Sequence, residues 1–324
     1  MTVTDEFTRL TGQFRGELIA HCYRMLGSVH EAEDVVQETY LRAWRSYGGF
    51  EGRSSVRTWL YRIATNACLT ALERQGRRPL PSGLGAPAGD PYTAGITASE
   101  LPWLEPFPDA LADGDPAAAA MSREGIRLAL IAALQHLSAR QRAMLILRDV
   151  LDWPAADVAD LLGTTTTAVN SGLRRARAQL ARALPAQDEL AEPAEPVSRA
   201  VLDRLAAAFE DADVTALAGL LRDDVVLEMP PVLTWFSGRP TVIRFLAARV
   251  LTAPGEFRTV PVTANGQPAL AVYRHRCAHA IVLPAVTATG IARITVFLTP
   301  DLFGAFGLPP VYAATPAGLA GLSL

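Results

Sequence analysis

The sequence predicts a multidomain protein, with two all-α helical domains followed by one α+β domain. Apolar residues recur every three or four positions through residues 7–78 and 122–184, whereas residues 225–298 contain short β-type runs. Stretches rich in proline separate these blocks. At 324 residues, half of them apolar, the chain is long enough for three cores. We therefore expect domains at 1–78, 122–185 and 198–324, with a linker at 79–121 and a hinge at 186–197.

The first domain should contain three helices. One apolar stripe runs from Phe7 to Met25 and ends before Gly27, and a second helix begins near His30 with acidic residues in its first turn. A turn-rich stretch at 48–55 precedes a third stripe that starts at Val56.

The second domain ends in a helix-turn-helix pattern. A short helix from Pro154 to Leu162 is followed by Gly163, which can end a helix in the left-handed conformation, and Thr164 or Thr165 can cap the next helix. That next helix carries short polar side chains and then arginines. Such a helix suits the major groove of DNA, where arginine pairs with guanine or phosphate. The alternative is an ordinary helical hairpin with a solvated arginine face.

The third domain should combine helices with six strands. We expect helices near 201–209, 217–221 and 240–250. The β-type runs lie at 225–229, 233–236, 257–262, 269–275, 280–283 and 291–298.

Charge is unevenly distributed, although the net charge is only −3. Residues 1–80 carry 11 arginines against nine acidic residues, and residues 118–185 carry nine against five, whereas residues 81–117 carry six acidic residues and no arginine. Two basic helical blocks around an acidic spacer are compatible with nucleic-acid binding despite the acidic total.

We expect no disulfide framework, no metal site and no cofactor. The three cysteines, Cys22, Cys68 and Cys277, are odd in number and far apart. The chain shows no run of about 18 apolar residues and no signal-like N-terminus. These features favour a cytoplasmic protein with buried thiols and no membrane contact.

Two patterns in the first domain suggest binding surfaces. One face of the second helix forms a ridge that is acidic at one end and apolar at the other, suited to a basic protein partner: Asp34, Gln37, Glu38, Leu41 and Trp44. Residues 58–66 mix aromatics, arginine and asparagine, which suits the grip of a single DNA strand. The alternative is that Trp59 and Ile63 belong to the core.

Together these motifs resemble a known family. Residues 7–78 are similar to region 2 of bacterial extracytoplasmic-function (ECF) sigma factors, through AEDVVQET at 32–39 and TWLYRIATN at 58–66. Residues 122–184 are similar to region 4 of the same family, through LSARQR at 137–142, VADLLG at 158–163 and VNSGLRRAR at 169–177.

The resemblance implies a non-enzymatic function, namely binding of RNA polymerase core, recognition of promoter DNA and promotion of its melting. It implies that the ridge faces the clamp helices of the β′ subunit and that region 4 seats on the β flap. It also implies that the −10 element is contacted by Phe50, Arg53, Ser54, Arg62 and Asn66. The −35 element would be read by Thr165, Thr166, Thr167, Asn170, Ser171, Arg174 and Arg175.

The third domain resembles a SnoaL-like, NTF2-type α+β cone, through FEDAD at 209–213, WFSGR at 235–239 and NGQPAL at 265–270. A subset of these sigma factors carries such a domain, and there it resembles a fused regulator of sigma activity. The same subset has a linker motif that is similar to Trp103, Leu104, Glu105 and Pro106 of this chain. This apolar island either packs on a neighbouring domain or is a docking element. We expect the cone and its tail at 300–310 to hold the helical domains through the island, with the sign of the effect left open.

Relatives of the cone include isomerases and hydrolases that work in an apolar pocket. Candidate pocket residues are Glu228, Trp235, His275 and His279, for which catalysis, ligand sensing and plain packing all stay open. A metal site at His275, Cys277 and His279 requires that all three share one face of a strand.

Two rival functions have different consequences. A one-component helix-turn-helix regulator with an effector-binding cone would bind duplex DNA without polymerase and would leave the ridge unused. A sigma factor whose cone is an isomerase or hydrolase would show turnover by residues 197–324.

Overall fold

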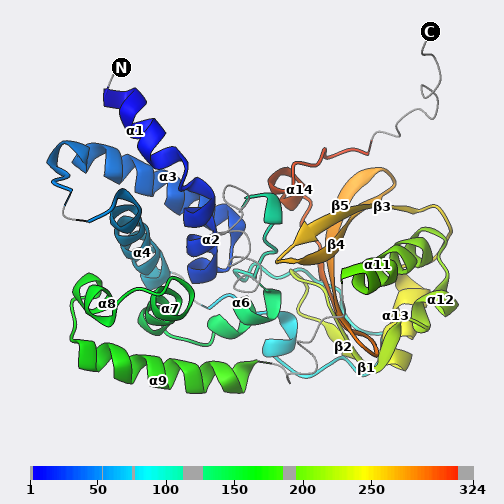
Figure 1. Cartoon of the computed structure of the whole chain (residues 1–324). Coiled ribbons are helices and arrows are strands. Elements are labelled where there is room, and N and C mark those ends of the chain that lie inside the picture. Colours follow the sequence, from blue (N-terminus) through cyan, green and yellow to red (C-terminus); the bar gives the residue numbers. More distant parts are fainter. Residues whose placement is uncertain (1–2, 53, 75–76, 112–126, 185–194, 313–324) are drawn as a thin grey trace, which may run out of the picture.

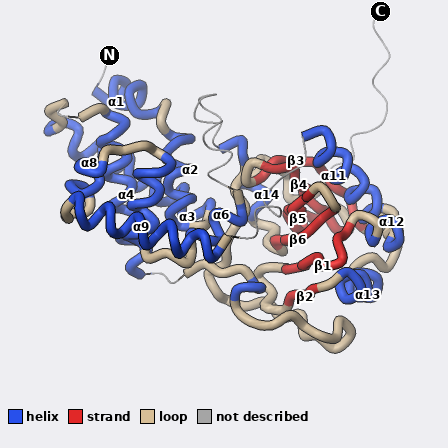
Figure 2. Tube along the Cα trace, turned by 60° about the horizontal axis from the view of Figure 1, so that its bottom comes forward, coloured by secondary structure: helices blue, strands red, loops and turns tan. Residues whose placement is uncertain are grey.

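The protein is arranged as a helical half and a sheet-containing half, with the linker running between them (Figure 1). The structure, a computed structural model, describes residues 3–52, 54–74, 77–111, 127–184 and 195–312. Figure 2 shows the two halves from another side, with helices α1–α9 gathered apart from the strands. Within the described ranges, no helix is both long and apolar enough to cross a membrane.

The first helical domain consists of α1 (Val3–Gly12), α2 (Arg15–Leu26), α3 (Val29–Ser46) and α4 (Val56–Arg74), with a 3-10 turn at Tyr47–Gly49. The expectation of one continuous helix to Met25 is wrong, because the chain turns at Phe14, whose N–H bonds to the carbonyl of Thr11. Gly27 ends α2 with φ 76°, and the Ser28 hydroxyl caps α3 by accepting from the N–H of Glu31.

The second helical domain consists of α6 (Leu128–Leu134), α7 (Ala139–Leu145), a π-turn at Ile146–Val150, α8 (Ala155–Leu161) and α9 (Thr166–Ala183). The helix-turn-helix of α8 and α9 is confirmed. Gly163 has φ 59°, and the Thr165 hydroxyl accepts from the N–H of Ala168 at 3.2 Å. Gly172 lets α9 approach α7 closely, since a Cβ there would lie 2.5 Å from the sulfur of Met144.

The cone begins with α11 (Glu195–Glu210) and α12 (Val214–Ala218). It continues with β1 (Leu221–Glu228), β2 (Trp235–Ser237), α13 (Arg239–Arg249), β3 (Phe257–Ala264), β4 (Gln267–Arg274), β5 (Cys277–Thr287), β6 (Gly290–Phe297) and α14 (Leu302–Ala305). The strand order is β2-β1-β6-β5-β4-β3, and only β1 and β6 pair in parallel. The short helix expected at 217–221 ends at Ala218, because Leu221 already pairs with β6.

Both faces of the sheet are covered. Side chains alternate along a strand, so Leu270 and Val272 join a core with α11, α12 and α13. Ala271 and Tyr273 point the other way and join a second core, which also contains buried residues of both helical domains. The helical domains and the cone therefore share one continuous apolar core.

The linker completes that core. Its described part contains 3-10 turns at Pro81–Gly83 and Asp109–Leu111. It first follows the sheet edge, where the N–H of Ala88 donates to the carbonyl of Trp235. It then passes between the cone and α2, where Leu104 and Phe107 are buried in the shared core.

Candidate functional site

The ridge predicted on α3 is present on the protein surface. Asp34, Gln37, Leu41 and Trp44 are exposed, and Glu38 is half-buried beside Arg42, with 2.7 Å between carboxylate and guanidinium. Leu41 and Trp44 retain 53% and 40% exposure, which is high for such large apolar side chains. Together they form an exposed apolar surface beside acidic groups, as a protein-docking site requires.

The residues expected to bind the −10 element lie on α4 and in the loop before it. Arg62 and Asn66 are one helical turn apart; Asn66 is exposed and Arg62 half-buried. Phe50 packs its ring 4.7 Å from the ring of Trp59, and Ser54 lies in the same loop. Arg53 lies outside the described residues. Trp59 and Ile63 pack against the core, which agrees with the alternative prediction that they are core residues.

The residues expected to read the −35 element lie in the first half of α9. Thr165, Thr166, Thr167, Asn170, Arg174 and Arg175 are exposed, and Ser171 is half-buried. Arg175 donates to the Ser171 hydroxyl at 3.2 Å. Val169, Leu173 and Ala176 face the core, so the polar side chains point away from the domain and are accessible to a DNA groove.

A contact that the sequence did not predict joins the two candidate DNA-binding domains. Arg62 on α4 forms an ion pair with Asp160 on α8, with 2.7 Å between Nη2 and Oδ2. The buried Arg142 of α7 donates to the carbonyl of Met25 at the end of α2. The first and second helical domains are thus docked on each other.

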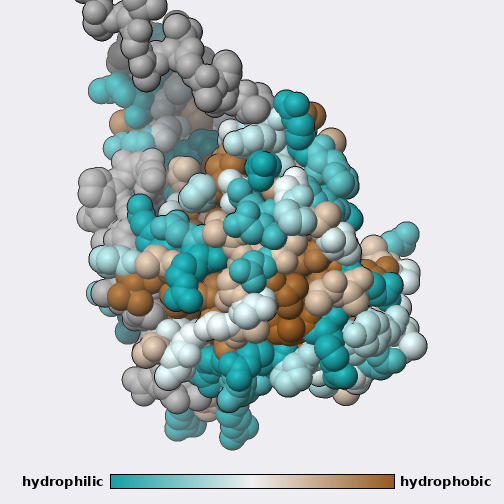
Figure 3. All heavy atoms as spheres, turned by 90° about the vertical axis from the view of Figure 1, so that its right-hand side faces the viewer, coloured by the Kyte–Doolittle hydropathy of each residue, from teal (hydrophilic) through white to brown (hydrophobic). Residues whose placement is uncertain are grey.

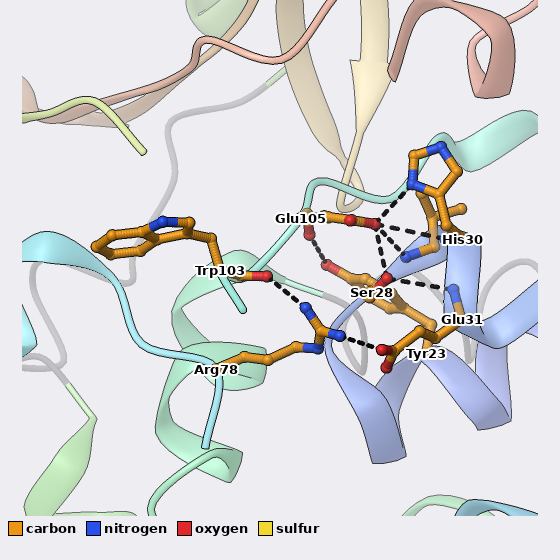
Figure 4. Close-up of polar contacts among 8 residues, drawn as sticks. Tyr23, Ser28, His30, Glu31, Arg78, Trp103 and Glu105 are labelled. Atoms are coloured by element: carbon orange, nitrogen blue, oxygen red, sulfur yellow. Dashed lines mark hydrogen bonds and ion pairs between the residues drawn. The ribbon is translucent and has the colours of Figure 1, made fainter. Parts of the chain in front are cut away.

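Residues 103–107 form the junction between these domains and the cone, and we call them the WLEPF segment (Figure 4). One carboxylate oxygen of Glu105 accepts from the Ser28 hydroxyl at 2.8 Å, the N–H of Val29 at 2.9 Å and the His30 ring at 3.1 Å. A carboxylate at this position interacts favourably with the free N–H groups at the start of α3.

Main-chain bonds hold the same segment. The N–H of Glu105 donates to the carbonyl of Gly27 at 3.0 Å, and the carbonyl of Glu105 accepts from the Tyr23 hydroxyl at 2.8 Å. Arg78 donates to the carbonyl of Trp103 at 2.9 Å and pairs with Glu31. Pro106 is buried, as are Leu104 and Phe107.

The pKa shifts at the junction follow from these contacts. The hydrogen bond to Glu105 raises the pKa of His30 above its usual range, against the opposing effect of burial. Burial alone would raise the pKa of Glu105, but the hydrogen bonds from His30 and Ser28 outweigh it and hold the pKa below its usual value. Both shifts favour the ionised pair.

The cone holds the other side of the WLEPF segment through Asn265, in the turn between β3 and β4. Its side-chain oxygen accepts from the N–H of Phe107 at 2.9 Å, and its amide donates to the Tyr23 hydroxyl at 2.8 Å. Asn265 is fully buried, and the Phe107 ring lies 4.7 Å from the Tyr23 ring. One asparagine therefore connects the cone, the linker and α2.

The tail after β6 adds to the junction. Leu302 and Phe303 of α14 are buried in the shared core, and Phe303 packs its ring 4.9 Å from Tyr273. Phe306 is partly buried against the same core.

The four candidate pocket residues of the cone do not converge. Glu228 is fully buried but pairs with Arg293 at 2.9 Å and accepts from the N–H of Ser82 in the linker. The Trp235 indole donates to the carbonyl of Gly85. Of the four, only His279 lines the apolar cavity of the cone.

The metal-site reading is wrong for a geometric reason. His275 lies in the turn between β4 and β5 with φ 49°, so it does not share a strand face with Cys277 and His279. The described ranges contain no cluster of three or more histidine, cysteine or acidic residues that could hold a metal. Cys22 and Cys68 are buried, but Cys277 is exposed, because it directly follows that turn.

The chain matches three sequence families. Residues 10–78 match Sigma-70 region 2, residues 127–180 match Sigma-70 region 4, and residues 202–298 match the SnoaL-like domain. These matches fall on the first helical domain, the second helical domain and the cone.

Two curated relatives are from Mycobacterium tuberculosis H37Rv. The chain is 48% identical over 313 residues to ECF RNA polymerase sigma factor SigG, covering 94% of this chain and 84% of the relative. It is 31% identical over 253 residues to sigma factor SigJ, covering 75% and 73%. The crystal structure of the M. tuberculosis ECF sigma factor SigJ matches with a TM-score of 0.61 at 25% identity, over 94% of this chain and all of that one.

Proposed function

Because the chain belongs to the ECF family of RNA polymerase sigma factors, we propose that the structure is the closed form of a sigma factor held by its own C-terminal domain. As a sigma factor it binds RNA polymerase and recognises promoter DNA. In this proposal the fused SnoaL-like domain acts as a regulator and not as an enzyme. In this proposal RNA polymerase and promoter DNA are the partners, and the protein acts in the cytoplasm.

The Arg62–Asp160 ion pair is the observation that carries the proposal. The −10 and −35 elements lie about 25 base pairs apart, or about 85 Å along B-DNA. In this structure, α4 touches α8 through a 2.7 Å ion pair. The longest helix of region 4, α9, has 18 residues and spans only about 27 Å. The two DNA-reading surfaces are therefore too close together to engage both elements at once.

Each candidate surface has a role in this proposal. Residues 1–78 would dock on the β′ clamp through the α3 ridge and capture an unpaired −10 base through Phe50, Asn66 and their neighbours. Residues 122–185 would read the −35 element with the first turns of α9 and seat on the β flap. Unpairing bases costs a few kcal/mol, and a pocket that accepts only the extruded base offsets part of that cost.

The cone would act as the restraint. The WLEPF segment is bonded to α3 on one side and to Asn265 of the cone on the other. Leu104 and Phe107 of the same segment also lie in the shared core with buried residues of both helical domains, so separation of these domains would disturb the packing of the segment. In this proposal the cone inhibits the free protein, and release of the WLEPF segment activates it.

A transcription assay with purified core polymerase tests the proposal. Trp103→Ala should raise open-complex formation relative to wild type, because it weakens the buried segment that joins the three domains. Glu100→Gln is the control, since Glu100 is exposed in the same linker. Point variants are preferable to removal of the cone, whose sheet completes the shared core. Equal activity of wild type and Trp103→Ala would exclude the regulatory role, and failure of both to bind polymerase would exclude the whole proposal.

A further inference from the structure

The cone contains an apolar cavity of about 330 Å³ that the proposed function does not use. It lies between the sheet and helices α11 and α13, with walls that include Phe209, Met229, Phe245 and Val282. Figure 3 shows hydrophobic side chains gathered on the side of the cone that carries these helices. This volume and lining fall within the range of small-molecule sites.

The linker forms part of this cavity. Ile96 contributes to the lining although it belongs to the linker and not to the cone. Arg249, at the end of α13, donates to the carbonyls of Tyr92 at 3.3 Å and Ala94 at 3.0 Å. The Thr234 hydroxyl donates to the carbonyl of Gly95. Residues 92–96 are thus held over the cavity by side chains of the cone.

The polar groups of the cavity favour one negative charge. Arg274 is neutralised by Glu256, with 2.6 Å between Nε and Oε1. Burial, followed by the charge of Arg274, lowers the pKa of His279 and keeps its ring neutral. No acidic residue lines the cavity, and no carboxylate in the described part of the chain pairs with Arg249. One uncompensated guanidinium therefore remains at the cavity.

We propose that this cavity binds an apolar monocarboxylate, with its hydrocarbon part against the sheet and its carboxylate on Arg249. A guanidinium binds a carboxylate through two charge-assisted hydrogen bonds, which are stronger than its bonds to neutral carbonyls. The ligand would take Arg249 from Tyr92 and Ala94 and occupy the space of Ile96. Residues 92–96 would then leave the cone. Release of residues 92–96 would loosen the linker that holds the closed form, a consequence that rests on the proposed function.

Calorimetric titration of the full chain with decanoate tests the site, with decanol as the uncharged probe. Decanoate should bind saturably at one site, and Arg249→Gln should weaken it at least about tenfold, as expected when a hydrogen bond to a charged group is lost. Arg244→Gln, an exposed arginine on the same helix, is the matched control and should leave decanoate binding unchanged. Absence of saturable binding, decanol binding as tight as decanoate, or equal effects of both variants would overturn the proposal.

Hydrogen exchange separates binding from linker release. Decanoate should speed exchange of the Ser99 N–H, which donates to the carbonyl of Pro231 just after the released residues, in wild type and not in Arg249→Gln. Binding without faster exchange would overturn the release mechanism. Neither the titration nor the exchange measurement uses polymerase or DNA, so a negative result in either one concerns the ligand site alone. The proposed function is tested separately by the Trp103→Ala transcription assay.

Discussion

Replacement of Glu105 by glutamine isolates the contacts that dock the WLEPF segment on the start of α3. The substitution keeps the size of the side chain and removes its charge. In the structure, one Glu105 oxygen accepts from the Ser28 hydroxyl, the N–H of Val29 and the His30 ring. The amide of glutamine keeps a single neutral acceptor oxygen, so these charge-assisted bonds are weakened or lost.

The expected effect is of the order of a few kcal/mol. Hydrogen bonds to a charged group contribute about 1.5–3 kcal/mol each, against about 1 kcal/mol for neutral ones. Because such contributions do not add, we expect a loss of about 2 kcal/mol in docking of the WLEPF segment. This corresponds to a roughly 30-fold larger population of the released segment.

Native-state hydrogen exchange measures that population. The N–H of Glu105 bonds to Gly27 and the N–H of Phe107 bonds to Asn265, so both are protected only while the segment is docked. Protection at positions 105 and 107 should fall roughly 30-fold in Glu105→Gln, following the estimate above. It should not fall in Glu100→Gln, which alters an exposed carboxylate of the same linker. Equal protection in the two variants would refute the reasoning.

Three further predictions concern single side chains. Docking raises the pKa of His30, to which Glu105, Glu33 and Asp301 contribute, so the stabilisation by His30 is complete below its ordinary pKa of about 6.5 and is lost as pH rises through the docked pKa. His30→Gln should remove this decline in docking when exchange of variant and wild type is compared at each of several pH values, and an equal decline in both would contradict the assignment. Asn66→Ala should reduce open-complex formation more than binding to core polymerase, and equal losses would contradict its assigned role. Gly163→Ala should lower the free energy of unfolding by about 1 kcal/mol, because its φ of 59° is left-handed; an unchanged thermal midpoint would count against that conformation.

The fold was largely predictable because it rests on local patterns. Helical periodicity, the left-handed Gly163 and the cap at Thr165 are properties of short segments, and they locate the helix-turn-helix. The short β-type runs likewise located the strands. The break at Phe14 was missed, since the apolar stripe continues across it and only the hydrogen bond to Thr11 reveals the turn.

The junction was less predictable because its partners are far apart in sequence. The sequence singled out Trp103–Pro106 as an apolar island that needs a covering surface. It gave no sign that Asn265 bonds Phe107 and Tyr23, or that Arg62 pairs with Asp160. The prediction that four residues approach one pocket was wrong for the same reason. Glu228 is paired with Arg293, and a local sequence pattern cannot show which buried charges already have a partner.

The distance between α4 and α9 tests the central claim most directly. Spin labels at Glu73→Cys and Ala178→Cys, both exposed, can be introduced with Cys277→Ser, since the other two cysteines are buried. The closed form predicts one short distance in the free protein and a distance longer by tens of ångströms in the polymerase–promoter complex. The same short distance in both states would contradict the account.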